Sequence, residues 1–312
     1  MRVPFPLAKG HMVNASIRSG PLVSAESALD AAARTWFVVT ALGQLLFAVY
    51  ILAHYGGSAA LGHAGRINAT LIHGIGKGDM VSDVAIVVHI VLAFVITAGG
   101  PLQLVLAAAI VPGGPFRLAP RTRARVMWLH RVNGRVYVVT AIVISIGALY
   151  LTWTQKPYLF HAGPAASAAA VIASTLNGIG IIVCAVLTMR YAVAGKIDAH
   201  RRWALRTFLL VSGVWFMRIT YGFWTIVTGH VPFGGGAPGT TGSLDGPFDM
   251  LVDYSRLIVP LLVLELYFRA QRDVDPQAKW TTARVLAGAT LVVAIGIVGT
   301  AKLMWLPQML RP

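Results

Sequence analysis

The chain has 312 residues, of which 56% are hydrophobic and 12% are charged, and its mean hydropathy is +0.70. Soluble domains carry charges on about a quarter of their residues, so this sequence lacks the polar surface that a water-soluble globule of this size needs. A disulfide-stapled scaffold is excluded as well, because Cys184 has no second cysteine to pair with. The composition therefore predicts an all-α, polytopic transmembrane helix bundle.

Lysine and arginine outnumber aspartate and glutamate by 26 to 11, which gives a net charge of +15 and an isoelectric point near 10.6. Such an excess is typical of nucleic-acid-binding proteins. It is also typical of membrane proteins whose loops lie against an anionic leaflet. The positions of the basic residues along the chain decide between these two classes.

Seven stretches are long and apolar enough to cross the hydrocarbon core, which takes about 20 residues as a helix. They are residues 36–55, 81–111, 126–153, 164–192, 203–229, 247–268 and 282–306. They form one predicted bundle over residues 36–306, preceded by a segment of residues 1–35 and followed by a tail of residues 307–312. The second stretch is longer than one bilayer thickness and contains Gly99-Gly100-Pro101. We therefore expect a kink there, or a helix that extends into the cytoplasm.

Basic residues alternate strictly between the two ends of the predicted bundle. Seventeen lysines and arginines lie in the N-terminal segment and in or next to the second, fourth and sixth connections, and five lie at the opposite end. Cytoplasmic loops are enriched in these residues, so the N-terminus is expected in the cytoplasm and the C-terminus outside. The sequence thus predicts a multi-pass protein of the cytoplasmic (inner) membrane, with phospholipid as a partner and no nucleic acid.

The third predicted span opens with a histidine and a glycine on one helical face. His130, Gly134 and Tyr137 are spaced to lie on that face, with Arg131 and Arg135 in a second stripe beside it. A glycine removes the side chain and lets a neighbouring helix or a ligand approach the backbone closely. This face is the first candidate binding surface.

The fifth predicted span opens with AHRRWALR, residues 199–206. His200 and Trp203 share a face, and Arg202 and Arg206 stack one turn apart. Like charges at this spacing repel each other, so we expect an anion between the two arginines, and a lipid phosphate is the simplest one.

Ionisable residues also lie deeper in the fifth and sixth predicted spans, where a charge needs a partner. Arg218 and Asp253 enter the bilayer from the same side to a comparable depth. We predict an ion pair between them, with Arg256 nearby. Glu265 is expected near the inner surface, at the level of the two histidines that open the third and fifth spans.

Several of these motifs, in this order, resemble a family of predicted bacterial membrane proteins classed as a domain of unknown function. They are His89 in the second span, GGPLQLV (99–105), HRxxGRxYV (130–138), HRRWxxR (200–206), the downstream Arg218, and LVLEL with Glu265. The resemblance covers residues 80–268 and leaves out the first and seventh spans. It implies the same membrane architecture and a bacterial origin, and it implies no particular activity.

The matched depth of His130 and His200 makes haem-linked electron transfer the most specific functional hypothesis. A six-coordinate haem b needs two imidazoles at one depth on facing helices and cations near its propionates. Gly134 would leave room for the macrocycle. The cations would be Arg131, Arg135 and Arg201. His54 and His89 form a weaker candidate pair in the outer half, a quinone is a candidate partner, and no metal other than haem iron is predicted.

Three other interpretations remain open. The two inner histidines are also explained as interfacial residues satisfied by phosphate, water or a carbonyl. A transporter or channel would line its path with Arg218, Asp253, Arg256 and Glu265 and use the Gly-Gly-Pro break as a hinge. A non-enzymatic lipid-interacting protein would bind anionic headgroups through the Arg202 and Arg206 cluster. The sequence identifies no nucleophile and no acid–base pair, so it leaves open whether the protein is an enzyme.

Overall fold

The computed structural model describes residues 24–68, 71, 75–76, 79–110, 118–154, 164–229 and 247–310. Every regular element in these ranges is a helix, so the predicted all-α class is confirmed for them. Most of the predicted N-terminal segment, residues 1–23, and the last two residues of the predicted tail lie outside the described residues.

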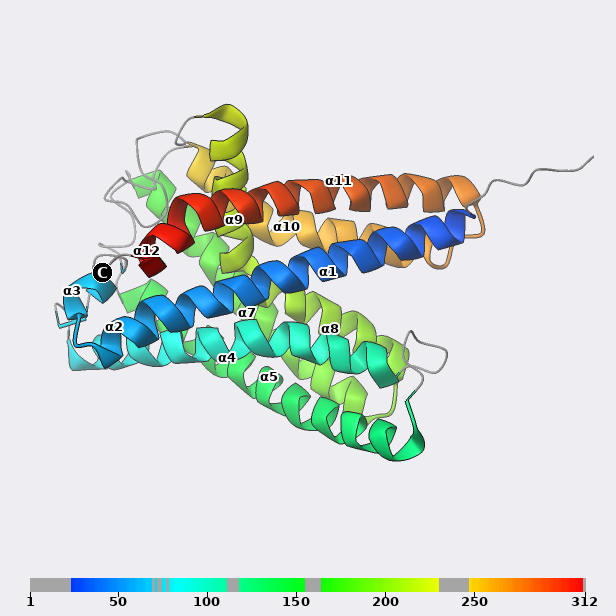
Figure 1. The fold of residues 1–312 in the computed structure, drawn as a ribbon, viewed down its shortest axis with the longest axis horizontal. Helices are drawn as coiled ribbons and strands as arrows, with labels where there is room; N and C mark the ends of the chain where they lie inside the picture. Colours follow the sequence, from blue (N-terminus) through cyan, green and yellow to red (C-terminus); the bar gives the residue numbers. More distant parts are fainter. Residues whose placement is uncertain are drawn as a thin grey trace, which may run out of the picture.

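Most of the long helices run back and forth along one long axis, whereas α9 lies across it (Figure 1). Their bounds are α1 Ala25–Ile51, η1 Leu52–Gly56, α2 Gly57–Ala60, α3 Ala64–Asn68, α4 Met80–Ile110, α5 Pro120–Thr154, α7 Pro164–Val193, α8 Ile197–Val211, α9 Gly213–Thr228, α10 Pro247–Ala270, α11 Pro276–Thr300, η2 Ala301–Trp305 and α12 Leu306–Leu310. The π-helical turns η1 and η2 continue α1 and α11 without a turn or bend between them. The start of α1 and the short helix α12 lie toward opposite ends of the long axis (Figure 1).

Side-chain caps fix where several helices begin. Ser24 accepts a hydrogen bond from the Ser27 N–H at the start of α1. Asp275 caps α11 in the same way and is followed by a proline at the first helical position. At the start of α4, the Asp79 carboxylate accepts bonds from both the N–H and the hydroxyl of Ser82, at 2.9 and 3.0 Å. Such caps satisfy backbone donors that have no partner within the helix.

The helix α10 buries charged side chains and exposes large apolar ones. In α10, Leu251 and Leu262 are 63% and 58% exposed, whereas Asp249 and Arg256 are only 6% and 9% exposed. Water would favour the opposite arrangement, so this distribution indicates that lipid surrounds the protein.

Five helices are long and apolar enough to cross a membrane among the described residues, and α8 with α9 makes a sixth if the bent pair is one span. The bend between them is 55° and falls at Ser212. The structure is therefore compatible with that of an integral membrane protein that has five or six apolar spans. The helix α10 falls outside this count because of its ionisable residues, so seven spans and their orientation stay predictions.

The helix α4 runs without interruption through Gly99-Gly100-Pro101 for 31 residues. At about 1.5 Å per residue it is about 46 Å long, longer than the hydrocarbon core of about 30 Å. The helix is thus continuous through this segment, and the kink and the extension into the cytoplasm both stay predictions. The missing side chain of Gly100 lets Phe208 of α8 and Tyr137 of α5 pack against α4.

The long helices pack into two groups. The helices α4, α5, α7 and α8 surround a core that includes Tyr137, Ile181 and Leu210. The helices α1, α9 and α11 surround a second core that includes Phe47 and Trp305. The helix α10 contacts members of both groups, which places its charged residues between them.

Candidate functional site

Two of the motifs found in the sequence, GGPLQLV of α4 and HRVNGRVYV of α5, contact each other directly. The Asn133 amide donates to the Gly99 carbonyl at 3.0 Å and to Gln103 Oε1 at 2.8 Å. The Gln103 amide nitrogen lies 3.0 Å from His130 Nδ1 and 3.4 Å from its Nε2. An amide nitrogen that lay in the ring plane, along the lone-pair direction of one ring nitrogen, would be much farther from the other ring nitrogen. The amide nitrogen of Gln103 therefore lies over the face of the His130 ring.

Gly134 has a different neighbour from the one expected. A Cβ atom at this position would lie 2.9 Å from Gln103 Nε2. The space that we expected a haem to use is thus filled by a side chain from α4. Gly134 allows α4 and α5 to approach each other, and a ligand there would have to displace Gln103.

His200 of the HRRW motif is held by α7. Its Nδ1 lies 3.0 Å from the backbone carbonyl oxygen of Thr188. A carbonyl can only accept, so Nδ1 carries the hydrogen and Nε2 of the neutral ring keeps its lone pair. The Thr188 hydroxyl donates to the Cys184 carbonyl at 2.7 Å and lies 3.0 Å from the Thr207 hydroxyl. These contacts fix the position and the tautomer of His200.

His130 lies in the first third of α5, and His200 lies in the first third of α8. They come from two helices that both pack against α7. We call the set of Gln103, His130, Asn133, Thr188 and His200 the inner cluster. Sequence reasoning missed the two amides and Thr188 as site residues, although an amide inside a span is itself a signal, since it needs a partner there.

The arginines next to these histidines have two kinds of environment. Arg131, Arg135 and Arg201 are exposed. Arg206 points inward, where its Nη2 lies 2.6 Å from Glu265 Oε1 and its guanidinium lies 4.8 Å from the centre of the Trp203 ring. The anion that pairs with Arg206 is therefore the carboxylate of Glu265, in place of the lipid phosphate that we expected. Arg202 lies over the Phe268 ring at 6.0 Å.

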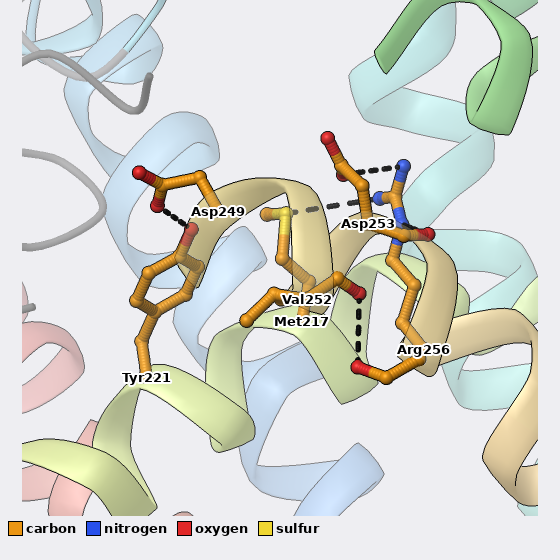
Figure 2. A network of polar contacts seen from close by, with 7 residues as sticks. Met217, Tyr221, Asp249, Val252, Asp253 and Arg256 are labelled. Carbon is orange, nitrogen blue, oxygen red and sulfur yellow. Dashed lines mark hydrogen bonds and ion pairs between the residues drawn. The ribbon is translucent and has the colours of Figure 1, made fainter. Parts of the chain in front are cut away.

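A second polar cluster lies between α9 and α10 (Figure 2). Arg256 Nη2 lies 3.1 Å from Asp253 Oδ1, and Arg256 Nη1 donates to the sulfur of Met217 at 3.7 Å. The Tyr221 hydroxyl donates to Asp249. Met217 and Tyr221 are one turn apart, so this face of α9 is turned toward α10.

The predicted ion pair between Arg218 and Asp253 is wrong. Asp253 pairs with Arg256, one turn along its own helix. Arg218 instead lies over the ring of Phe47 of α1, with its guanidinium carbon 5.2 Å from the ring centre. The reason is rotational: Arg218 follows Met217, which faces α10, and successive residues point about 100° apart around a helix.

The histidines of the weaker outer pair have different surroundings. The His54 ring stacks on Tyr50, with the ring centres 5.4 Å apart, and meets the edge of Tyr55. His89 lies in α4, where its Nδ1 is buried and has no hydrogen-bond partner within the described part of the chain.

Comparison with protein-family models, with curated proteins and with solved structures finds no match. The resemblance to a family of unknown function therefore stays a prediction. The residues themselves are the basis for a functional argument.

Proposed function

We propose that the protein is a membrane electron-transfer protein that binds haem b at the inner cluster, with His130 and His200 as axial ligands. The observation that carries this proposal is the hydrogen bond from His200 Nδ1 to the Thr188 carbonyl. Histidines that bind metals almost always donate their other ring N–H to such an acceptor, because it fixes the ring and the tautomer. Helix bundles build cofactor sites from side chains on facing helices in this way.

The other residues of the inner cluster have defined tasks in this proposal. Haem would supply one-electron chemistry when bound. His130 would hold the haem through one of its ring nitrogens. Gln103 is a flexible side chain and would leave the space beside Gly134, while Asn133 keeps its bond to the backbone of α4. The exposed cations that would face carboxylates at the inner surface are Arg131, Arg135 and Arg201. We propose a quinone as the electron donor or acceptor.

The test is an absorbance spectrum of protein purified in detergent from haem-supplemented cells. We expect a Soret band and an α band that sharpens on reduction by dithionite. His130→Ala and His200→Ala should each remove at least nine-tenths of the bound haem. His63→Ala is the matched control, because His63 is exposed and lies outside the helices. A colourless wild-type protein, or equal haem loss in the control, would contradict the proposal.

We further propose that the bundle has seven spans in the bacterial inner membrane, with its N-terminus in the cytoplasm. The alternation of basic residues supports this orientation. The exposed leucines and buried charges of α10 support a crossing by that helix. Single cysteines replacing Ser24 and Gln308 test it, in a chain whose own Cys184 is buried. An impermeant maleimide added to spheroplasts should label Cys at position 308 and not at 24, and the reverse result would overturn the orientation.

A second candidate function, ion-coupled transport, is favoured by the break between α8 and α9. Interrupted helices near the middle of a bundle often form substrate sites in transporters. Here the break lies at buried Ser212, whose hydroxyl accepts a hydrogen bond from buried Gln44 of α1 at 2.7 Å. Tracer flux in proteoliposomes tests this candidate with Asp253→Asn and Glu265→Gln. If both variants keep every wild-type flux, transport through these residues is excluded.

A further inference from the structure

Arg218 carries a charge that no carboxylate balances within the described residues. Arg206 and Arg256, which also point into the bundle, lie 2.6 and 3.1 Å from carboxylate oxygens. Arg218 has Phe47 beneath it instead, and its Nε is buried and has no hydrogen-bond acceptor in the part of the chain that the structure describes. Among the described residues, Arg218 therefore differs from the other two arginines because no carboxylate pairs with it.

An arginine cannot escape this situation by losing its proton, because its guanidinium stays charged at every accessible pH. Arg218 is half-buried with its Nε fully enclosed, and a charge in such a place is unfavourable without a counter-ion. The attraction between a guanidinium and an aromatic ring is weaker than an ion pair and satisfies none of the N–H donors. A group that accepts hydrogen bonds and carries negative charge would stabilise Arg218.

Two further donors lie around the same phenylalanine. Trp215 is one turn before Arg218 on α9, and Trp305 of η2 stacks on Phe47 with the ring centres 5.3 Å apart. The indole N–H groups of both tryptophans are buried and have no acceptor among the described residues. Buried donors are rarely left without a partner in folded proteins. These unpaired N–H groups and the positive charge favour a ligand that presents oxygen acceptors.

We infer that Arg218, Trp215 and Trp305 bind an amphiphilic oxyanion, meaning a carboxylate or a phosphate attached to an apolar chain. The charged end would pair with Arg218, and the aromatic rings of Phe47 and Trp305 would contact the apolar part. A free fatty acid and an anionic phospholipid are the two sources of this chemistry in a membrane. The inference is independent of haem binding, since it uses a different group of helices.

Quenching of tryptophan fluorescence tests the site in protein purified in a neutral maltoside detergent. Dibromostearate is the probe, because its bromine atoms quench tryptophans that they approach. We expect saturable quenching that dodecanoate or dodecyl phosphate reverses and uncharged dodecanol does not. The stronger of the two competitors identifies the headgroup. Equal competition by dodecanol would overturn the proposal.

Variants make the test specific to Arg218. Arg218→Gln should weaken probe binding at least tenfold, whereas Arg125→Gln, which removes an exposed arginine of α5, should leave it unchanged. If Arg218→Gln fails to fold, Trp305→Phe removes one donor without changing the charge and should weaken binding about threefold. In wild-type protein, dodecanoate should also raise the midpoint of thermal unfolding more than dodecanol. Probe affinity within twofold of wild type in both variants would refute the site.

Discussion

Arg206 of α8 and Glu265 of α10 form a two-point ion pair, in which Nη2 and Nε of the arginine lie 2.6 and 2.8 Å from one carboxylate oxygen. The pair joins α8, which carries His200, to α10, which also carries Asp249, Asp253 and Arg256. The Glu265 side chain is 40% exposed, so solvent screens part of the attraction.

We expect Glu265→Gln to lower the free energy of unfolding in detergent by about 1 kcal/mol. A double-mutant cycle with Arg206→Gln should give a coupling energy of about the same size. Glu26→Gln, at an exposed position in the first turn of α1, is the control. Additive effects of the two changes would show that the pair contributes nothing to stability.

The contact between α9 and α11 depends on glycines. A Cβ atom on Gly222 would lie 2.5 Å from the backbone nitrogen of Thr300 and 2.6 Å from the carbonyl oxygen of Gly296. Backbone atoms cannot move aside as a side chain can, so Gly222→Ala must push the helices apart. We expect a loss of about 1–3 kcal/mol in unfolding free energy.

Gly288 of α11 provides the matched control for that substitution. A Cβ atom there would meet nothing within 4 Å. Gly288→Ala should stabilise the protein by up to about 1 kcal/mol, since alanine favours helix more than glycine does. Equal destabilisation by the Gly222 and Gly288 variants would refute close packing as the cause.

Gly134→Ala tests the role that the structure gives this glycine. The added methyl should displace the Gln103 amide and cost about 1 kcal/mol through the lost bond to Asn133. Gln103→Ala made together with it should remove the clash, so the double variant should be no less stable than Gln103→Ala alone. Gly147→Ala on the same helix, with open space around its Cβ, should cause no loss. Additive destabilisation in the double variant would contradict the contact.

Asp79 links the stability of α4 to pH. The Ser82 N–H and hydroxyl donate to the ionised carboxylate and hold its pKa below the ordinary value. A lowered pKa in the folded state means stabilisation at neutral pH that is lost as the pH falls through the carboxyl pKa, about 4 and below. Asp79→Ala should therefore lower the thermal midpoint at pH 7 and have no effect near pH 2. A difference between the proteins that persists at pH 2 would exclude this cause.

The long apolar helices could be predicted because lipid leaves the backbone few alternatives. A chain in hydrocarbon must satisfy its own N–H and C=O groups, and a helix does so within one segment. The matched depth of His130 and His200 was predicted by counting residues along their spans, and it stays a prediction. Composition indicates which segments form long apolar helices, and spacing along the chain indicates how far along a helix a residue lies.

Rotation about a helix axis was not predictable in the same way. Spacing gave the depth of Arg218 but not the direction in which it points, because the 55° bend at Ser212 sets the course of α9. The filling of the space beside Gly134 depends on the register between α4 and α5, which brings Gln103 opposite it. Contacts between helices of this kind come from packing, and no local pattern in one span encodes them.

The buried charges of α10 have a consequence for biogenesis. A segment with Asp249, Asp253, Arg256 and Glu265 partitions poorly into lipid by itself, because each central charge costs about 2.5–3.5 kcal/mol on the insertion scale. In the finished bundle, Met217 and Tyr221 of α9 receive two of these side chains. In the seven-span arrangement that we propose, α9 would therefore stay near the protein-conducting channel until α10 is made, and the two segments would enter the lipid as a pair.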